Sequence, residues 1–351
     1  MINLLDLDKR QMRDLFTDSP YRGSQLFAWV FGKAVPGLDA MTSLPKSLRV
    51  ELSRGYTISY PEHVEVQASS DGTEKHAWRL HDGLIIESVL MPEKSHWSLC
   101  ISSQAGCAMG CAFCYTATMG FHRNLETSEI VSQVLSLLRA YPDRQIRNVV
   151  FMGMGEPLLN YGNVVKAIRI LTDPDGPHFS KRRITVSTCG IVPSLESICR
   201  ETEAALAVSL NSPVNAVRER LMPVTKKYPL GELLDALKSC RLPNRRRITV
   251  EYVLVRGIND SVRDARELVR ILHGLKVKVN LIPFNPWPGC PLEAPGPEAV
   301  SSFEEVLKDS PYAVMVRKEK GRDILAACGQ LAGGAQERGE KARAPHGEAH
   351  D

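Results

Sequence analysis

The N-terminal part of the chain has hydrophobic positions at helical spacing. In SPYRGSQLFAWVFGK, Leu26 and Phe27 are followed by Val30 and Phe31, so that the four side chains fall on one helix face. In MTSLPKSLRVELSR a proline stands early in a second candidate helix, where its missing N–H is tolerated. The pattern predicts a small helical accessory domain over residues 1–58.

The pattern then changes to short apolar–polar alternation in HVEVQASSDGTEKHAWRLHDGLIIESVLMP. Asp71-Gly72 and Asp82-Gly83 interrupt it, and such pairs are typical of tight turns between antiparallel strands. We therefore expect a short antiparallel β linker region over residues 59–95.

From His96 onward, candidate strands alternate with amphipathic helices. The strand candidates are HWSLCIS, RNVVFMG, RITVST, AALAVSL, ITVEYVLV, VKVNLIPF and AVMVRK. Helical patterns such as TSEIVSQVLSLLRAY, YGNVVKAIRIL, VPSLESICRE, LGELLDALKSC and SVRDARELVRILHGL lie between most of them. Strands that alternate with helices of this length form parallel sheets through right-handed crossovers. The units are too few for an eight-fold barrel, so the fold class predicted for residues 96–330 is α/β, a partial TIM-like (β/α)6 barrel.

Composition narrows the class of protein. The 351 residues are 43% hydrophobic and 24% charged, as in an ordinary soluble enzyme. No apolar run approaches the roughly 18–20 residues of a membrane helix, and the N-terminus is too polar for a signal peptide. We therefore expect a cytoplasmic protein with no membrane partner. Residues 331–351 are small and charged, and we expect a disordered tail there.

The charge pattern does not by itself indicate a nucleic-acid binder. The net charge is only +4. Stronger local clusters begin at Lys181, Lys226 and Arg245, and each is available for phosphate contacts. Solvated loop ends explain each cluster equally well.

The stretch CAMGCAFCYTATMGF holds three cysteines, Cys107, Cys111 and Cys114, in eight residues. A structural zinc site takes four protein ligands, so zinc requires a histidine or Cys100 in addition. An iron–sulfur cluster fits better, because a cubane takes one thiolate per iron and three cysteines leave one iron open to a non-protein ligand. The loop follows a candidate barrel strand, and in parallel barrels the chemistry lies on such loops. With an aromatic residue before its last cysteine, the motif resembles the radical S-adenosylmethionine (SAM) superfamily. The resemblance implies a 4Fe-4S cluster whose open iron is chelated by SAM, which one-electron reduction cleaves to a 5′-deoxyadenosyl radical.

A second candidate site follows the next strand, in VVFMGMGEPLLN. Gly153 and Gly155 allow the backbone to approach a ligand closely, and Glu156 can pair with an ammonium group such as that of SAM. A tight turn with a capping glutamate is the alternative explanation. Further candidates for hydrogen bonds to the adenosine and carboxylate of SAM stand just past other strands: Ser187, Ser209, Leu210, Asn211 and Asn285.

Longer stretches resemble one family within this superfamily. They are CISSQAGCAMGCAFCYTATMGFHRNL, FMGMGEPLLN, SLNSPVNAVRERLMPVTKKYPL, EYVLVRGIND, VNLIPFNP and ACGQLAG, and they look like the RlmN/Cfr family of RNA methyltransferases. The helical N-terminal segment resembles the accessory domain of the same family. The resemblance implies two SAM molecules per turnover. One methylates a cysteine, and the other yields the radical that activates this methyl group for addition to an adenine ring.

The resemblance also assigns three residues. Cys328 in AACGQLAG matches the methyl-carrying cysteine, and Cys100 in SLCISSQ matches the resolving thiol that releases the methylated RNA by forming a disulfide. Without the family, both are better explained as buried core cysteines. Glu87 in LIIESVLMP matches the proposed proton acceptor, although strand alternation alone also explains a polar residue there. Whether Glu87 or Cys100 removes the ring proton stays open.

The run GMGEPLLN, the run MPVTKKYPL and the ending GRDILAACGQLAG are closer to the RlmN branch. That branch methylates carbon 2 of adenine in 23S rRNA at the peptidyl transferase centre and in tRNA just 3′ of the anticodon. Asn211 departs from the family pattern, where histidine is common, and so does Tyr115, whose ring we expect to cover the cluster. We expect a monomer that receives electrons from flavodoxin or ferredoxin.

Three alternatives remain. A Cfr-type enzyme would methylate carbon 8 of the adenine. A radical SAM activase of a protein glycyl centre would need neither Cys100 nor Cys328. A non-catalytic RNA-binding iron–sulfur module would cleave no SAM and leaves GMGEP unexplained.

Overall fold

The computed structural model describes residues 1–240 and 246–333. Arg245, the first residue of one basic cluster, lies outside the described residues. The expected disordered tail does so as well, except for residues 331–333.

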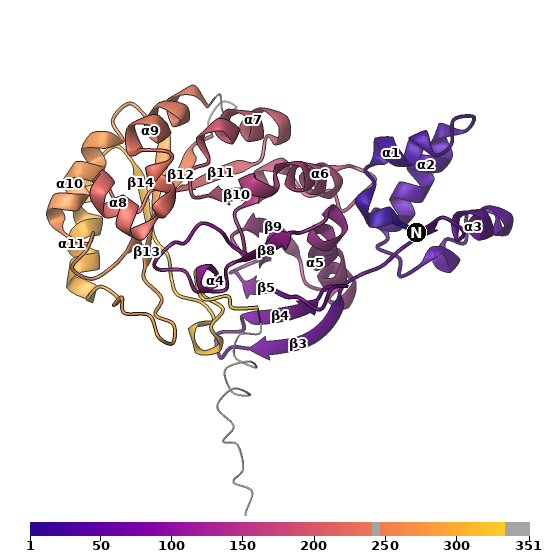
Figure 1. Ribbon diagram of the computed structural model, residues 1–351, viewed down its shortest axis with the longest axis horizontal. Helices are drawn as coiled ribbons and strands as arrows, with labels where there is room; N and C mark the ends of the chain where they lie inside the picture. Colours follow the sequence, from indigo (N-terminus) through magenta and orange to yellow (C-terminus); the bar gives the residue numbers. More distant parts are fainter. Residues whose placement is uncertain (241–245, 334–351) are drawn as a thin grey trace, which may run out of the picture.

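The centre of the molecule is one sheet of ten strands (Figure 1). Their order across the sheet is β14-β13-β12-β11-β10-β9-β6-β5-β4-β3. The bounds are β3 (Glu62–Ala68), β4 (Glu74–Arg79), β5 (Ile85–Pro92), β6 (Trp97–Cys100), β9 (Ile146–Phe151), β10 (Ile184–Thr188), β11 (Ala205–Ser209), β12 (Ile248–Leu254), β13 (Val277–Pro283) and β14 (Ala313–Val316). From β6 to β14 every pairing is parallel, whereas β3, β4, β5 and β6 pair antiparallel.

The α/β class and the parallel strands are confirmed, since each strand candidate after His96 forms a strand of this sheet. In the described residues β14 and β3 are the two edges and do not pair with each other, so the barrel is open. The antiparallel strands expected over residues 59–95 form as well. Because β5 pairs with β6, they extend the barrel sheet beyond its first parallel strand.

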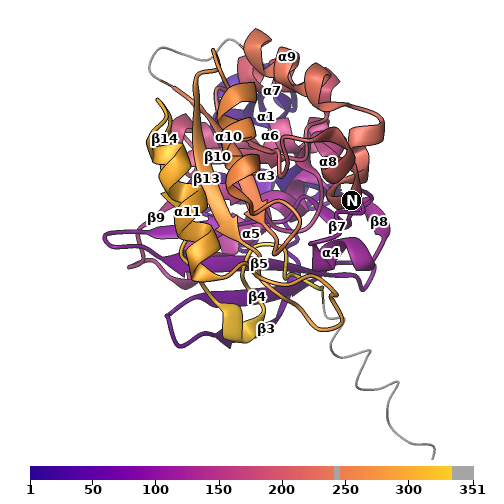
Figure 2. The ribbon, with the colours of Figure 1, turned by 90° about the vertical axis from the view of Figure 1, so that its left-hand side faces the viewer.

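Helices cover the outer face of the parallel strands (Figures 1 and 2). They are α5 (Thr127–Ala140), α6 (Tyr161–Thr172), α7 (Val192–Thr202), α8 (Asn215–Leu221), α9 (Leu230–Ser239), α10 (Val262–Ile271) and α11 (Pro297–Lys308). Each lies in a connection between two consecutive parallel strands, as expected for an α/β sheet. No helix in the described part of the chain is long and apolar enough to cross a membrane.

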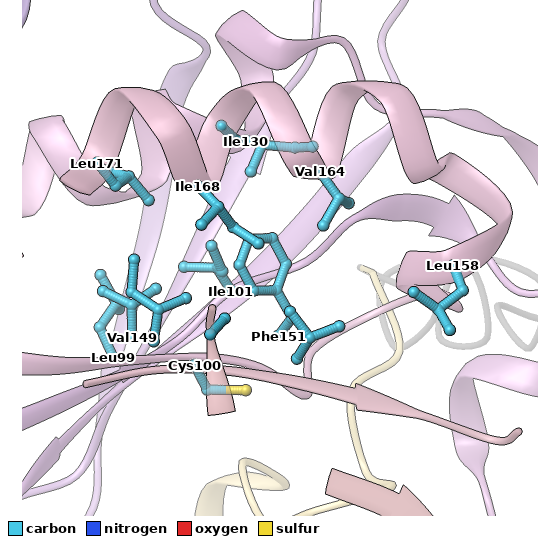
Figure 3. Close-up of a cluster of buried hydrophobic side chains, with 14 of the residues drawn as sticks. Leu99, Cys100, Ile101, Ile130, Val149, Phe151, Leu158, Val164, Ile168 and Leu171 are labelled. Carbon is cyan, nitrogen blue, oxygen red and sulfur yellow. The ribbon is translucent and has the colours of Figure 1, made fainter. Parts of the chain in front are cut away.

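The core between sheet and helices is visible around β6 and β9 (Figure 3). Leu99 and Val149 on the strands, with Val164 and Ile168 on α6, are buried and interdigitate there. Side chains alternate along a strand, so Cys100 directs its sulfur to the other face of the sheet, away from these helices. The inner face of the sheet is where the candidate site lies.

The N-terminal segment is helical, as its pattern predicts. It contains η1 (Leu4–Asp6), α1 (Lys9–Asp14), α2 (Pro20–Phe27), η2 (Ala28–Gly32), η3 (Leu38–Ala40) and α3 (Lys46–Leu52), and the short strands β1 (Ile2–Asn3) and β2 (Tyr56–Thr57) pair across its ends. It contacts the barrel at α5, where the backbone N–H of Ser128 donates to the Asp6 carboxylate at 2.7 Å. It also contacts the end of α6, where Lys9 forms ion pairs with Asp173 at 2.9 Å and Asp175 at 2.6 Å.

Candidate active site

A cavity opens at the carboxyl ends of the parallel strands. Most of the residues expected in the site line it: Cys107, Cys111, Cys114, Gly155, Glu156, Ser187, Ser209, Asn285 and Cys328. These residues come from segments that are up to about two hundred residues apart in the chain. Four other candidates, Cys100, Glu87, Leu210 and Asn211, do not line the cavity and are described below.

The three-cysteine loop is held by the strands on either side of it. β7 (Gln104–Gly106) and β8 (Phe121–Asn124) form a hairpin, and the loop with the short helix α4 (Tyr115–Thr118) projects from it. Gly106 has a φ of +75°, and a Cβ there would lie 2.0 Å from the carbonyl oxygen of Gly120. Only glycine therefore allows the hairpin to close at the base of the loop. At its far side the loop rests on the C-terminal end of α8, through a 2.9 Å hydrogen bond from Ala112 N to Leu221 O.

The thiols of this loop share one environment. Burial raises the pKa of Cys107 to about 12. Burial and the neighbouring Cys114 and Cys107 thiols raise the pKa of Cys111. Three soft sulfur donors that disfavour one another's ionisation are a suitable donor set for a cationic iron–sulfur centre, which would stabilise the thiolates. Within the described residues, no three cysteine, histidine or carboxylate side chains are gathered closely enough to hold a metal ion as they stand.

The zinc alternative required a histidine or Cys100 as fourth ligand. Neither a histidine nor Cys100 lines the cavity. Cys189 does, and burial together with Glu156 and Cys111 raises its pKa.

The loop after β9 brings Glu156 to the cavity wall. Gly155 has a φ of +99°, and a Cβ there would meet the Gln104 side chain at 2.4 Å. The Glu156 carboxylate accepts hydrogen bonds from Leu158 N at 2.9 Å and Cys189 N at 2.7 Å. Burial raises the pKa of Glu156, and these two N–H groups oppose that shift. Glu156 therefore caps the turn, as the alternative explanation required. Each of its carboxylate oxygens still has a lone pair that can accept a hydrogen bond from a ligand in the cavity.

The other expected SAM contacts divide into two groups. Ser187, Ser209 and Asn285 line the cavity, and the Asn285 side-chain oxygen is buried without a hydrogen-bond partner. Such an acceptor is available to a bound molecule. The Asn285 amide also donates to the Cys328 carbonyl at 3.2 Å.

Asn211 and Leu210 are buried behind the cavity wall. The Asn211 side chain accepts from Val253 N at 2.7 Å and donates to the Met222 sulfur at 3.1 Å. Its φ of +58° is a conformation that asparagine adopts more readily than most residues. In this structure the Asn211 side chain therefore links β11 to β12 and does not face the cavity.

The Cys100 and Cys328 thiols lie near the guanidinium group of Arg317. Burial and the Cys328 thiol raise the pKa of Cys100 to about 12, and Arg317 opposes this shift. Burial raises the pKa of Cys328, again opposed by Arg317. Arg317 also lines the cavity, close to a second charged residue, Glu251, whose carboxylate accepts from Asn280 at 2.8 Å.

Sequence reasoning missed Arg317 and Glu251. A signal existed for both, since Glu251 interrupts the hydrophobic strand ITVEYVLV and Arg317 directly follows the strand AVMV. A charged residue in or just past a buried barrel strand indicates a polar cavity at that point.

Glu87 lies on β5 beside the cavity region. It is 5% exposed, and its carboxylate accepts from Ala332 N at 2.8 Å. Lys75 Nζ lies 3.7 Å from the other carboxylate oxygen. Glu87 thus contacts the segment that carries Cys328.

Tyr115 does not line the cavity. Its ring stacks on Trp287, with centroids 4.8 Å apart and planes 2° from parallel. The Trp287 indole N–H donates to the Phe113 carbonyl at 3.2 Å. The stacked pair joins the loop after β13 to the cysteine loop. We expected the Tyr115 ring to cover the cluster, but in this structure it packs on Trp287.

The basic clusters lie on different sides of the barrel. η5 (Lys181–Arg183) precedes β10, which is the end of the sheet opposite the cavity, and Lys181 forms an ion pair with Glu203 at 3.2 Å. η6 (Pro223–Lys226) follows α8 and adjoins the cysteine loop, where a Cβ on Gly110 would lie 3.6 Å from the Pro223 ring. Only the second of these two clusters is near the cavity.

A CxxxCxxC loop at the mouth of an open α/β barrel defines a radical SAM protein, and residues 101–269 match the model of the radical SAM superfamily. The structure is similar to the crystal structure of a radical SAM methyltransferase from Sphaerobacter thermophilus, with a TM-score of 0.89 and 41% identity over 94% of this chain and 99% of that one.

The family is narrower than this class. Residues 2–58 match the model described as the ribosomal RNA large subunit methyltransferase N-terminal domain. The chain is 45% identical to the dual-specificity RNA methyltransferase RlmN of Syntrophus aciditrophicus, over 96% of this chain and 98% of the relative. It is 49% identical to the RlmN of Geotalea uraniireducens, over 89% of this chain and 90% of the relative. The chain belongs to the RlmN family of radical SAM RNA methyltransferases.

Proposed function

We propose that this enzyme makes 2-methyladenosine in 23S rRNA, at the peptidyl transferase centre, and in tRNA, at the adenosine 3′ of the anticodon. The observation that carries the proposal is that Cys328, which lines the cavity, lies close enough to Cys100, from the other end of the barrel sequence, to raise the pKa of the Cys100 thiol. An activase or a passive binding module has no use for such a pair. The family's dual-specificity members support the two RNA substrates.

The cofactor roles follow from the cavity lining. Cys107, Cys111 and Cys114 would hold a 4Fe-4S cluster, and Glu156, Ser187, Ser209 and Asn285 would contact SAM. Leu210 and Asn211 would support this wall from behind, since they are buried next to Ser209. When bound, the cluster and SAM supply methyl transfer and one-electron cleavage that yields a hydrogen-abstracting radical. Two SAM molecules are consumed per methylated base.

The Cys328 and Cys100 sulfur atoms would carry the methyl group and release it. The Cys328 sulfur loses its proton and forms a bond to the SAM methyl carbon as the carbon–sulfonium bond breaks. After hydrogen abstraction from this S-methyl group, its carbon radical would add to carbon 2 of the adenine. The adduct radical would then give up one electron, which the oxidised cluster could accept, and the carbon-2 proton. The Cys100 sulfur would then attack the Cys328 sulfur and form a disulfide as the bond between Cys328 and the transferred carbon breaks. That carbon keeps the electron pair and takes up a proton, which completes the methyl group. An external thiol must return two electrons to the disulfide before the next cycle.

The proton on carbon 2 needs an acceptor. Glu87 and Cys100 are the candidates, and both are buried on neighbouring strands of the antiparallel part of the sheet. Arg317 assists ionisation of both sulfurs by its charge, since it lowers the pKa of each thiol against the effect of burial.

The enzyme would need an electron donor and an RNA substrate as partners. Flavodoxin or ferredoxin would donate the electron, the enzyme would act as a monomer in the cytoplasm, and Lys226 near the cavity would contact RNA phosphate. The target base must leave its stack, because its ring carbon has to reach Cys328.

The experiment is mass spectrometry of nucleosides from rRNA and tRNA that lack this methylation. The RNA is incubated anaerobically with reconstituted enzyme, SAM and a reductant. We expect 2-methyladenosine in both pools. 8-Methyladenosine would assign the carbon-8 branch, and 5′-deoxyadenosine without any methylated nucleoside would refute the RNA substrates.

A further inference from the structure

The segment that carries Cys328 has little structure of its own. Between β14 and residue 333, where the described part of the chain ends, its only helix or strand is the short 3-10 turn η7 (Arg322–Ile324). Gly321, Leu325, Gly329 and Gly333 all have positive φ, and for Leu325 this conformation is strained. Contacts with other parts of the molecule must therefore set the position of the Cys328 sulfur.

Some of those contacts come from the cysteine loop and the loop after β13, since Tyr115 N donates to the Gly329 carbonyl at 2.6 Å and the Asn285 amide donates to the Cys328 carbonyl at 3.2 Å. Others come from the antiparallel strands. In Figures 1 and 2 the C-terminal described segment, in yellow, lies beside β4 and β5. Lys75 Nζ donates to the Ile324 carbonyl at 2.7 Å. Ala332 N donates to the Glu87 carboxylate at 2.8 Å. Ile324 and Ala332 are four residues before and four residues after Cys328, so the two contacts fix the segment on both sides of the sulfur.

The two anchoring side chains also contact each other. Lys75 on β4 and Glu87 on β5 lie on adjacent antiparallel strands, where Glu87 pairs with Ala77 and Lys75 with Val89. Lys75 Nζ and Glu87 Oε1 are 3.7 Å apart, and the residues are only 6% and 5% exposed. The two side chains are thus diagonal neighbours on adjacent strands and lie on the same face of the sheet.

A buried ion pair is poor evidence for a contribution to stability. The desolvation of two charges offsets most of their attraction, and apolar replacements are often as stable. What the pair provides is geometry, because an ammonium and a carboxylate in a low-dielectric environment hold their partners in fixed places. Here each charge has a backbone group of the Cys328 segment as a partner.

A second set of contacts holds the outer end of the same segment. Asp323 accepts from the Ser69 hydroxyl at 2.6 Å, and Asp71 accepts from Gly321 N at 2.9 Å. Asp71, Ser69 and Asp323 lie at or near the surface turn between β3 and β4, and neither contact reaches past Cys328. These contacts can keep the segment docked when the buried pair is broken.

We propose that the Lys75–Glu87 pair positions Cys328 for methyl transfer, and that Lys75 is a positioning residue of this reaction. The inference rests on the proposed role of Cys328 as the methyl-carrying residue. It gives Glu87 a second function besides that of candidate proton acceptor. It also explains why an antiparallel extension continues the barrel sheet on the Cys328 side.

The test is single-turnover methylation of Cys328 with isotopically labelled SAM, read by peptide mass spectrometry. In Lys75→Met we expect the rate of Cys328 methylation to fall at least about tenfold, because small misplacements of a reacting group cost that much or more. The rate of 5′-deoxyadenosine formation should stay within about twofold, since Lys75 does not line the cavity. Lys75→Arg should recover most of the methylation, because it restores a cation that can donate to Ile324 O.

The matched control is Lys94→Met, which removes an exposed lysine from the turn between β5 and β6. Methylation of Cys328 at the same rate in Lys75→Met and Lys94→Met would overturn the proposal. Equal losses of methylation and of SAM cleavage would also overturn it, because they would indicate general damage to the barrel.

A measurement without turnover separates this proposal from the proposed function. Amide hydrogen exchange at Ala332, with alkylation of Cys328 by iodoacetamide, reports the position of the segment even if wild-type Cys328 accepts no methyl group. We expect both to accelerate in Lys75→Gln relative to Lys94→Met. Unchanged exchange would refute the anchor, whereas faster exchange in an enzyme that never methylates Cys328 would refute only the catalytic role. If Lys75→Met does not fold, Lys75→Gln decides the same question.

Discussion

Two irregular segments bring sulfur to the same cavity, and they are held in different ways. The cysteine loop projects from its own hairpin, whose strands β7 and β8 immediately flank it in the chain. The Cys328 segment is held in part by Lys75 and Glu87, which are about 250 residues away in the chain. The first arrangement is local in the chain, so the sequence shows it as a compact motif. The second depends on the completed sheet, so a single cysteine near the C-terminus is all that the sequence shows.

We therefore expect damage to the first segment to stop all chemistry, whereas damage to the second should stop the methylation of Cys328 and of RNA but leave SAM cleavage intact. Cys107→Ala should abolish cluster binding and 5′-deoxyadenosine formation together, because a cubane needs each of its thiolates. Iron content and product chromatography measure this. Cys290→Ala, which changes a half-buried cysteine outside the cavity lining, should retain both. SAM cleavage by Cys107→Ala at the wild-type rate would contradict the assignment.

The second segment is tested by its two thiols. Cys328→Ala should yield no methylated RNA and no covalent complex, while SAM cleavage continues. Cys100→Ala should instead accumulate a covalent protein–RNA adduct, because the bond between Cys328 and the methyl carbon then has no thiol to break it. Denaturing gel electrophoresis with labelled RNA distinguishes them. Identical behaviour of the two variants would remove the distinction between methyl carrier and resolving thiol.

A smaller effect sharpens the comparison at the cavity wall. Gly155→Ala should lower stability by about 1–3 kcal/mol, because alanine is strained at a φ of +99° and its Cβ would meet Gln104 at 2.4 Å. It should also weaken SAM binding, since Glu156 would shift. Thermal unfolding and SAM titration measure the two effects. Gly162→Ala on α6 has nothing within 4 Å of its Cβ and should be neutral or slightly stabilising. Equal effects of the two substitutions would contradict a strained turn at Gly155.

The smallest expected effect concerns alkaline pH. Burial raises the pKa of Cys100 to about 12 in the folded protein, whereas an unfolded thiol titrates near ~8.5. The contribution of this group to stability is therefore fully present below about pH 8.5 and is lost as pH rises toward 12. Urea unfolding of the apoprotein between pH 8 and pH 10 should show a shallower loss of stability in Cys100→Ala than in wild type. Parallel curves for the two proteins would mean that the Cys100 thiol ionises as readily in the fold as in the unfolded chain.

Much of the fold could be predicted from periodicity. The alternation of VVF, ITVST and VKVNLIP with amphipathic helices is a local property, so the parallel sheet followed from it. The three-cysteine loop, the GMGEP turn and the serines in the last residues of β10 and β11 were found for the same reason, since each stands at a recognisable strand end. Glu251 and Arg317 were missed because a single charge in a hydrophobic strand shows no partner until the strands are side by side. Asn211 was expected in the cavity, yet its side chain is occupied by Val253 N and Met222.

The sequence by itself determined the class of chemistry, because the spacing of Cys107, Cys111 and Cys114 and the glycines around Glu156 are local requirements of a ligand-binding loop. It also determined the parallel part of the sheet, since hydrophobic periodicity acts within one element at a time. Only the tertiary structure decided that β3, β4 and β5 extend the barrel and that Lys75 and Glu87 contact both sides of Cys328. Those contacts join residues whose proximity depends on the register of distant strands, and no local pattern carries that register.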